Sequence, residues 1–238
     1  GFAEYGLVTD TRALLEDEPG TDLGYAYYQL PVPAEADILP EDALMLITLK
    51  ETAGFLMNLR FSLNTPLVIL GSASVAQAMC FFAKLLGAVP LIVVGRRDEP
   101  LDEIRRFGAD YTVNTTRQDM VAAVMEWTGG RGAELVCDAA GDECLIREAL
   151  RLLSPTGRIA PYATFSSKDP LVGIPPERLV QADTGEVPAH EYLLDLVGMG
   201  VVDLSSFYSH QLPFEDIVRG FELLFKKQAV KVVFTISD

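Results

Sequence analysis

The sequence predicts a doubly wound α/β fold, in which helices cover both faces of a parallel sheet. Five short runs with strand character alternate with segments of helical periodicity. The runs are mostly apolar throughout and lack the polar alternation of a half-exposed strand, so each is expected to be buried on both faces. A chain of 238 residues with 49% hydrophobic content can bury one good-sized core, alone or with a smaller appendage.

The strands and helices of this fold can be placed in order along the chain. Strands are expected at 67–70, 91–94, 111–113, 135–137 and 158–160. The helices between them are expected at 75–86, 101–107, 119–127 and 143–153. Apolar residues at helical spacing support these helices, and glycines or a Ser-Pro turn mark their ends.

The two ends of the chain have a different pattern. Residues 1 to about 45 are rich in Pro, Gly, Glu and Asp, which predicts loops and β-hairpins. The segment 164–187 is predicted to be a long loop. Helices at 191–199 and 214–226 and a strand at 230–236 are expected to complete the chain.

Composition excludes several classes of protein. The net charge of −15 and the sequence pI near 4.5 argue against nucleic-acid binding, which needs a basic face. No stretch approaches the roughly 18 apolar residues of a membrane span, and the N-terminus lacks the order of a signal peptide. Cys80, Cys137 and Cys144 have no CxxC spacing, so a cytoplasmic protein with reduced thiols is expected. A first residue of Gly1 rather than Met predicts a trimmed product or a fragment.

The turn after the first predicted strand has features of the phosphate-binding turn of a Rossmann unit. There, glycines let the backbone approach a pyrophosphate, whose charge the helix N-terminus stabilises. The turn reads Gly71-Ser72-Ala73-Ser74-Val75-Ala76, so the bend glycine is present but Ala73 replaces the middle glycine. The hydroxyls of Ser72 and Ser74 are candidate donors to the phosphates. The alternative interpretation is a small-residue crossing in a fold that has lost its nucleotide.

The end of the second predicted strand indicates which dinucleotide is bound. NADH enzymes usually place Asp or Glu there to bind the ribose hydroxyls. This chain has Gly95-Arg96-Arg97, which leaves room for a 2′-phosphate and provides two guanidinium groups to hold it. NADP(H) is therefore favoured over NAD(H). The alternative is that Arg96 and Arg97 are ordinary surface charges, as Arg105 and Arg106 would be.

Further stretches resemble successive motifs of the medium-chain dehydrogenase/reductase family, in particular its zinc-type alcohol and polyol dehydrogenases. In chain order these are Gly1–Tyr5, Ala83–Ala88, Arg106–Asp110, Thr128–Gly132 and Asp138–Gly141, followed by a tail from His210 to Val233. The resemblance covers nearly the whole chain in the expected order, which is more specific than any single motif.

The resemblance implies a set of coenzyme-binding residues. Gly71, Ser72, Ala73, Ser74 and Val75 match the family's phosphate turn, Arg96 and Arg97 its adenosine ribose position, and Ala140 and Gly141 the loop at the nicotinamide ribose. Tyr162 and Ala163 match the strand end beside the carboxamide, and Lys231 matches a basic residue that reaches the coenzyme phosphates in relatives. The alternative for Lys231 is a solvated surface lysine.

The resemblance also implies three parts and their roles. Residues 1–45 would be a remnant of a GroES-like catalytic domain and linker, residues 46–187 the Rossmann dinucleotide-binding domain, and residues 188–238 a return toward the catalytic domain. The expected architecture is thus a doubly wound parallel sheet with remnants of a β-rich catalytic domain at both ends. Most of that catalytic domain would precede the chain.

No zinc is expected in this chain. Thr48 and Leu49 fall where zinc-type relatives offer a ligand, and neither side chain is a suitable one. Glu51 is expected to be solvated on a helix surface, and His190 and His210 each stand alone. The catalytic residues are therefore left unassigned.

The expected function is the NADP(H)-binding portion of an alcohol or polyol dehydrogenase-like oxidoreductase. Its partner would be a small alcohol or carbonyl substrate, with zinc, where an upstream domain supplies it, acting as a Lewis acid. By resemblance a homo-oligomer, specifically a dimer, is expected. Two alternatives stay open: a non-catalytic nucleotide-binding scaffold, which Ala73 and Thr48 favour, and an oligomerisation platform that binds no dinucleotide.

Overall fold

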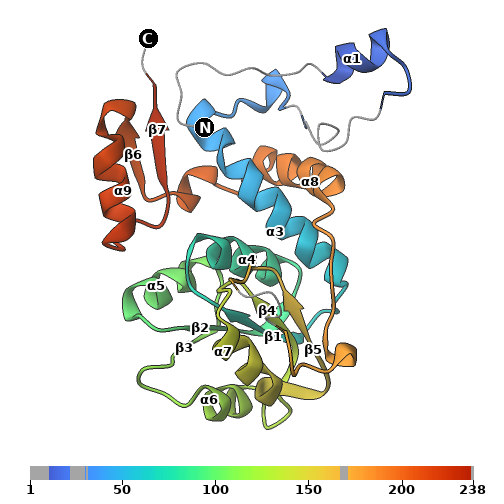
Figure 1. Ribbon diagram of the computed structural model, residues 1–238, viewed down its shortest axis with the longest axis vertical. Helices are drawn as coiled ribbons and strands as arrows, with labels where there is room; N and C mark the ends of the chain where they lie inside the picture. Colours follow the sequence, from blue (N-terminus) through green and yellow to red (C-terminus); the bar gives the residue numbers. More distant parts are fainter. Residues whose placement is uncertain (1–10, 22–29, 31, 167–170, 237–238) are drawn as a thin grey trace. The chain divides into compact units, whose positions relative to one another are not determined.

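The computed structural model describes residues 11–21, 30, 32–166 and 171–236 (Figure 1). The chain divides into two compact units. One unit is the continuous segment Met45–Gly185, and the other combines Gly1–Leu44 with Glu186–Asp238. No helix in the described part of the chain is long and apolar enough to cross a membrane.

The unit Met45–Gly185 is built on a five-stranded sheet with the strand order β3-β2-β1-β4-β5. The strands are β1 (Thr65–Leu70), β2 (Ala88–Gly95), β3 (Tyr111–Asn114), β4 (Ala133–Asp138) and β5 (Leu153–Pro161). All neighbouring pairs are parallel. The predicted doubly wound α/β fold is confirmed.

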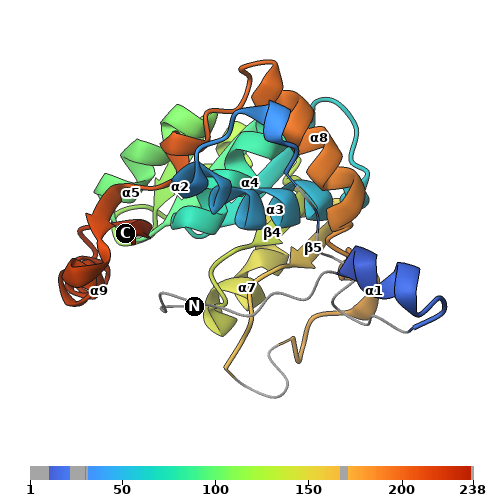
Figure 2. The same ribbon diagram turned by 90° about the horizontal axis from the view of Figure 1, so that it is seen from above.

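Helices cover both faces of this sheet (Figure 1). They are α3 (Met45–Leu59), α4 (Ser74–Leu85), α5 (Asp98–Glu103), η3 (Ile104–Phe107), α6 (Met120–Trp127), α7 (Glu143–Glu148) and η4 (Ala149–Leu152). α3 lies beside α4, as both ribbon views show (Figure 2). The helices predicted at 101–107 and 143–153 each finish in a 3-10 segment, which tightens the last turn.

The central strands are completely buried because helices pack on both of their faces. Val68 and Leu70 of β1 lie in one apolar cluster with Val124 of α6 and Ile146 of α7, and all four side chains are 0% exposed. Successive side chains of a strand point to opposite faces, so Leu67 and Ile69 must enter the other side of the sheet. This double burial is the reason that the strand sequences have no polar alternation.

The helix α3 has no counterpart among the predicted elements, although Glu51 was expected on a helix surface. Its buried residues include Leu46, Leu49, Ala53 and Leu56. These positions repeat at helical spacing, so the signal is present in the sequence. The neighbouring Pro- and acid-rich stretch obscured it.

The second unit contains a small parallel pair of strands, β6 (His210–Pro213) and β7 (Val232–Thr235). They are joined through η7 (Phe214–Asp216) and α9 (Ile217–Phe225). Gly220 of α9 is required by this packing, because a side-chain carbon there would overlap the ring of Phe234. The helix and final strand agree with the sequence prediction, whereas β6 was not predicted.

The other described residues of this unit include five helical segments. They are α1 (Thr11–Asp17), η2 (Ala34–Ala36), α2 (Pro40–Ala43), α8 (Glu186–Gly198) and η6 (Leu204–Phe207). The β-hairpin expected within residues 1–45 is wrong for the described residues 11–21, 30 and 32–44, which contain helical turns and no strand. One reason is that Pro40 occupies the first position of α2, where its fixed φ favours a helix. The remaining residues of that segment, including the motif Gly1–Tyr5, lie outside the described part.

The predicted long loop 164–187 is only partly irregular. Its described residues include the 3-10 turn η5 (Pro176–Arg178) and a bridge between Leu179 and Ile159 of β5. The guanidinium of Arg178 donates hydrogen bonds to the carbonyl oxygens of Ser154 and Gly157, at 3.2 and 2.9 Å. These contacts hold the segment against the edge of the sheet.

Candidate nucleotide-binding site

The strand order reverses at β1, from which the chain moves first to β2 and β3 and later to β4 and β5. In an open parallel sheet, the crevice at such a switch point, beyond the carboxyl ends of the strands, is where ligands bind. The turns after β1, β2, β4 and β5 therefore surround the candidate site. Each contains residues that the sequence analysis selected.

The turn after β1 has a backbone suited to an anionic group. Gly71 has a φ of +115°, and a side-chain carbon there would lie only 3.2 Å from the carbonyl carbon of Ala139. Ala73 has φ −90° and ψ −171°, an extended conformation open to any residue, and its methyl group is exposed. Replacing the middle glycine by alanine thus causes no backbone strain. The first N–H groups of α4 have no intrahelical partner, and no N-cap side chain accepts from them, so they can donate to a ligand.

The end of β2 is closely packed at Gly95, where an acidic residue would bind a ribose hydroxyl. Gly95 is buried, and a side-chain carbon at this position would lie 2.9 Å from Ser72 Oγ and 3.1 Å from Leu101 Cδ2. The next two residues are exposed arginines, and the side chain of Arg96 is 76% exposed. Two exposed cations therefore follow a position where a larger side chain would have to displace Ser72 and Leu101.

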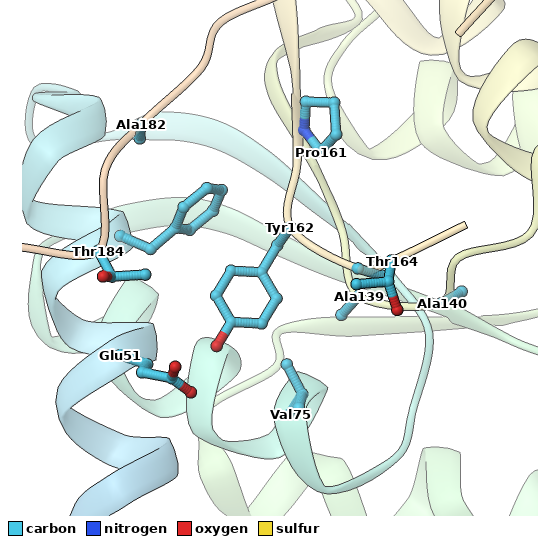
Figure 3. Close-up of a pocket in the computed structure, with 11 residues that line it drawn as sticks. Glu51, Val75, Ala139, Ala140, Pro161, Tyr162, Thr164, Ala182 and Thr184 are labelled. Carbon is cyan, nitrogen blue, oxygen red and sulfur yellow. The ribbon is translucent and has the colours of Figure 1, made fainter. Parts of the chain in front are cut away.

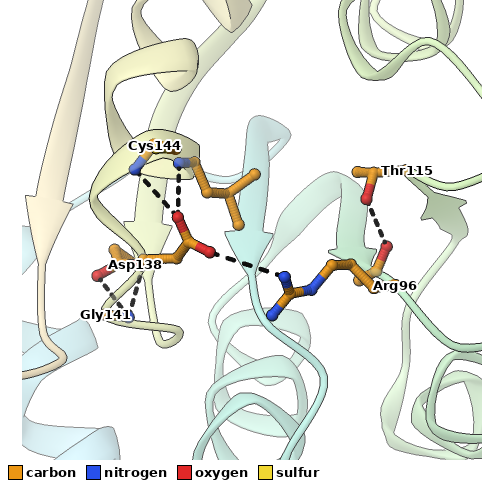
Figure 4. A network of polar contacts seen from close by, with 8 residues as sticks. Arg96, Thr115, Asp138, Gly141 and Cys144 are labelled. Carbon is orange, nitrogen blue, oxygen red and sulfur yellow. Dashed lines mark hydrogen bonds and ion pairs between the residues drawn. The ribbon is translucent and has the colours of Figure 1, made fainter.

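The turn after β4 is organised by the buried carboxylate of Asp138. Its oxygens accept hydrogen bonds from the backbone N–H of Ala140 at 3.1 Å and of Gly141 at 3.3 and 3.2 Å (Figure 4). Burial raises the pKa of Asp138, these two hydrogen bonds oppose the shift, and the nearby charge of Asp142 adds to it. Gly141 has a φ of +65°.

A cavity of about 570 Å³ lies between these turns and α3 (Figure 3). It is lined by Glu51, Phe55, Val75, Ala139, Ala140, Pro161, Tyr162, Ala163, Thr164, Ala182 and Thr184. The ring of Tyr162 meets that of Phe55 edge to face, with centroids 5.0 Å apart. The backbone N–H groups of Tyr162 and Ala163 donate to the carbonyl oxygen of Asp138, at 3.1 and 3.0 Å. The strand end of β5 is thus tied to the turn after β4.

The structure brings together part of the predicted site. Val75, Ala140, Tyr162 and Ala163 line the cavity. Gly71 to Ser74 form the turn that leads into α4, and Arg96 and Arg97 follow β2. Lys231 belongs to the second unit, so its proposed role at the phosphates stays a prediction.

Several cavity residues were not selected from the sequence as nucleotide contacts. Glu51, considered as a metal ligand, instead lines the cavity (Figure 3). The other residues missed are Phe55, Ala139, Pro161, Thr164, Ala182 and Thr184. Ala139, Pro161 and Thr164 adjoin predicted residues, whereas no local motif marks Glu51, Phe55, Ala182 and Thr184, which come from α3 and from the end of a loop. Among the described residues, no three His, Cys, Asp or Glu side chains are grouped as a metal site.

The three cysteines differ in burial, since Cys80 and Cys137 are buried and Cys144 is exposed. Burial raises the pKa of Cys80 to about 12, with the charge of Asp110 adding to the shift, and burial also raises the pKa of Cys137. Cys144, near the start of α7, is exposed. Because the thiolate is the reactive form, we expect one thiol to react with a dithionitrobenzoate reagent in the native protein and three in denaturant.

The Cys144→Ser variant provides the control for this thiol count. It is expected to show no rapidly reacting thiol while folded. Rapid reaction of a second thiol in the native wild type would contradict the burial of Cys80 and Cys137.

The sheet and its switch-point crevice define the class of the domain as a doubly wound nucleotide-binding fold of the Rossmann type. Residues 74–184 match the family model described as zinc-binding dehydrogenase. An alcohol dehydrogenase of Cupriavidus necator is 26% identical over 93% of this chain and 58% of its own length. An L-threonine 3-dehydrogenase of Bacillus velezensis is 27% identical over 69% of this chain and 49% of its own. Over this segment and most of the chain, the protein is thus similar to zinc-type alcohol and threonine dehydrogenases, in agreement with the resemblance seen in the sequence.

Solved structures have the same fold. The alcohol dehydrogenase of Thermus sp. ATN1 superposes with a TM-score of 0.71 at 23% identity, over 87% of this chain and 62% of its own. A short chain alcohol dehydrogenase of Escherichia coli CFT073, solved in complex with the cofactor NADH, gives a TM-score of 0.73 at 18% identity, over 90% and 63%. The chain spans about half to three-fifths of the length of these relatives.

Proposed function

We propose that this chain is the NADP(H)-binding portion of an oxidoreductase that transfers a hydride between the coenzyme and a small alcohol or carbonyl compound. The observation that carries the coenzyme preference is the end of β2. Gly95 lacks the acidic side chain that would bind a free ribose hydroxyl, a side-chain carbon there would crowd Ser72 and Leu101, and Arg96 and Arg97 follow it directly. Guanidinium groups are well suited to hold a 2′-phosphate.

The other turns have complementary roles in this proposal. The backbone of Gly71 to Val75 and the N-terminus of α4 would hold the pyrophosphate. Ala140 and Gly141 would lie at the nicotinamide ribose, and Tyr162 and Ala163 beside the carboxamide, in the cavity that three of these four residues line. Lys231 would reach the phosphates. The bound dinucleotide would supply or accept the hydride.

The relatives support the reaction class but leave the coenzyme open. Their names cover alcohol, L-threonine and erythritol/L-threitol dehydrogenases, which share hydroxylated small-molecule substrates. The structure of the E. coli relative contains NADH, so NAD(H) is the competing coenzyme. We further propose a cytoplasmic homodimer, on the basis of the family resemblance and the unpaired cysteines.

A parallel titration with NADPH and NADH, followed by fluorescence, tests this proposal. Wild type is expected to bind NADPH more tightly than NADH, and Arg96→Ala to weaken NADPH binding by about 10- to 100-fold, the effect of losing a charged hydrogen-bonding partner. Arg151→Ala is the matched control. It removes the same charge from a side chain that is 63% exposed and paired with Glu148. Arg151 belongs to η4, which precedes β5, so it lies at the amino ends of the strands, opposite the candidate site.

Each contrary outcome has a distinct meaning. Equal binding of NADPH and NADH, unaffected by Arg96→Ala, would contradict the role of the β2 end. Binding of neither nucleotide would favour the alternative of an oligomerisation platform that binds no dinucleotide.

A further inference from the structure

The carboxylate of Asp142 faces Arg96 across the candidate site. Asp142 Oδ2 lies 4.0 Å from the Arg96 guanidinium (Figure 4). We propose that Asp142 sets the affinity for a 2′-phosphate, because it competes with that phosphate for Arg96. This inference rests on the proposed NADP(H) function and adds a specificity-determining residue that the sequence analysis did not select.

The side chain of Asp142 is held in place by hydrogen bonds from the first turn of α7. Its Oδ1 accepts hydrogen bonds from the backbone N–H of Cys144 at 3.0 Å and of Leu145 at 3.1 Å, which makes Asp142 the N-cap of α7. One oxygen is therefore anchored to the helix, while the other is directed toward Arg96 (Figure 4). Asp142 is the stationary member of the pair.

Arg96 is the member that can move. Its side chain is 76% exposed, against 38% for Asp142, and it follows β2 directly. β1 lies between β2 and β4, so the pair bridges the carboxyl end of β1, where the turn at Gly71 begins. The Arg96 guanidinium must therefore give up its contact with Asp142 before it can bind a phosphate at the end of β2.

The expected size of the effect follows from the exposure of the pair. Exposed ion pairs contribute little, so releasing Arg96 should strengthen binding of a 2′-phosphate by about two- to fivefold. The gain should shrink as ionic strength rises, because salt screens exposed charges. A ligand without the 2′-phosphate does not need Arg96 and should not respond.

The test variant is Asp142→Asn, because asparagine is also a good N-cap and keeps the oxygen that anchors α7. The control is Glu103→Gln, which removes the partner of Arg106. That pair has nearly the same exposure, 72% and 42%, but lies at the end of α5, away from the turns of the site. Circular dichroism and thermal melting confirm that each variant is folded.

The probes are adenosine 2′,5′-bisphosphate and 5′-AMP, titrated by calorimetry. Asp142→Asn is expected to bind the bisphosphate about two- to fivefold more tightly and 5′-AMP unchanged, and Glu103→Gln to match wild type. In an Arg96→Ala background, Asp142→Asn should give no gain. Three results would overturn the inference alone: no gain for the bisphosphate, an equal gain for both ligands, or a gain that persists without Arg96. Binding of neither ligand to any variant would overturn the proposed function together with this inference.

Discussion

Replacing Gly54 by alanine is expected to lower the free energy of unfolding by about 3 kcal/mol, the upper end of the cost of overpacking. Gly54 lies within α3, and a side-chain carbon there would overlap the carbonyl oxygen of Thr184. The collision is with backbone, so no side-chain rotation relieves it. The adjacent contact from Asn58 Nδ2 to the Asp183 carbonyl, at 2.7 Å, would also be strained.

The measurement for this variant is thermal and denaturant unfolding. A loss of this size corresponds to a drop of roughly 6 to 12 °C in the melting temperature of a protein of this length. Gly198→Ala is the matched control, since Gly198 is also helical but has open space at this position, and it is expected to be neutral or slightly stabilising. Equal stability of the two variants would contradict the close approach of α3 and Thr184.

Gly54→Ala should also disturb the cavity. Thr184 and Ala182 form part of its wall, and the displaced backbone carries both of them. Weaker NADPH binding is therefore expected at temperatures where the variant is still folded. Full affinity in a folded variant would mean that this wall does not contribute to the site.

Asp138→Ala is the second substitution with a large expected effect, a loss of about 2 kcal/mol in the free energy of unfolding. The carboxylate of Asp138 is completely buried and accepts hydrogen bonds from the backbone N–H groups of Ala140 and Gly141. Removing the acceptor leaves these donors without a partner, and each orphaned buried donor costs about 1–3 kcal/mol. Because water can partly solvate the N–H of the exposed Ala140, the total loss of stability is expected near the lower end of the range for two donors.

Asp138→Asn separates the charge of this residue from its hydrogen bonding. Because the pKa of Asp138 is raised in the folded protein, the protonated form is favoured there relative to the unfolded chain. The contribution of Asp138 to the stability of the folded protein is fully present below the ordinary pKa of 3.8. It is lost as the pH rises through the raised pKa of Asp138 in the folded protein. Wild type should therefore gain stability relative to Asp138→Asn as the pH falls from neutral toward 4. A difference independent of pH would show that burial does not disfavour the charge.

The sheet could be predicted from the sequence because each central strand is buried on both faces. That burial requires runs such as Leu67–Leu70 and Leu91–Val94 to be apolar throughout, and such runs with intervening helices indicate a parallel sheet covered by helices. The strand β6 gave no such signal. It contains His210, Gln211 and Pro213, and it is defined by its pairing with β7 rather than by its own composition.

The candidate site could be predicted only where it follows the strand ends. Gly71, Arg96 and Tyr162 each come directly after a strand, so the topology fixes their position at one edge of the sheet. The cavity wall from α3 and the pairing of Arg96 with Asp142 depend on tertiary packing between distant segments. No spacing in the sequence encodes such contacts.

The arrangement of the two units along the chain has a consequence for folding during synthesis. The unit Met45–Gly185 is uninterrupted, whereas the other unit needs residues both before and after it. Domains tend to fold as they emerge from the ribosome, at roughly 5–20 residues per second. The sheet-containing unit is thus expected to be complete several seconds before β6 and β7 have been translated. In the interval the segment that ends at Leu44 lacks the later residues with which it forms its own unit.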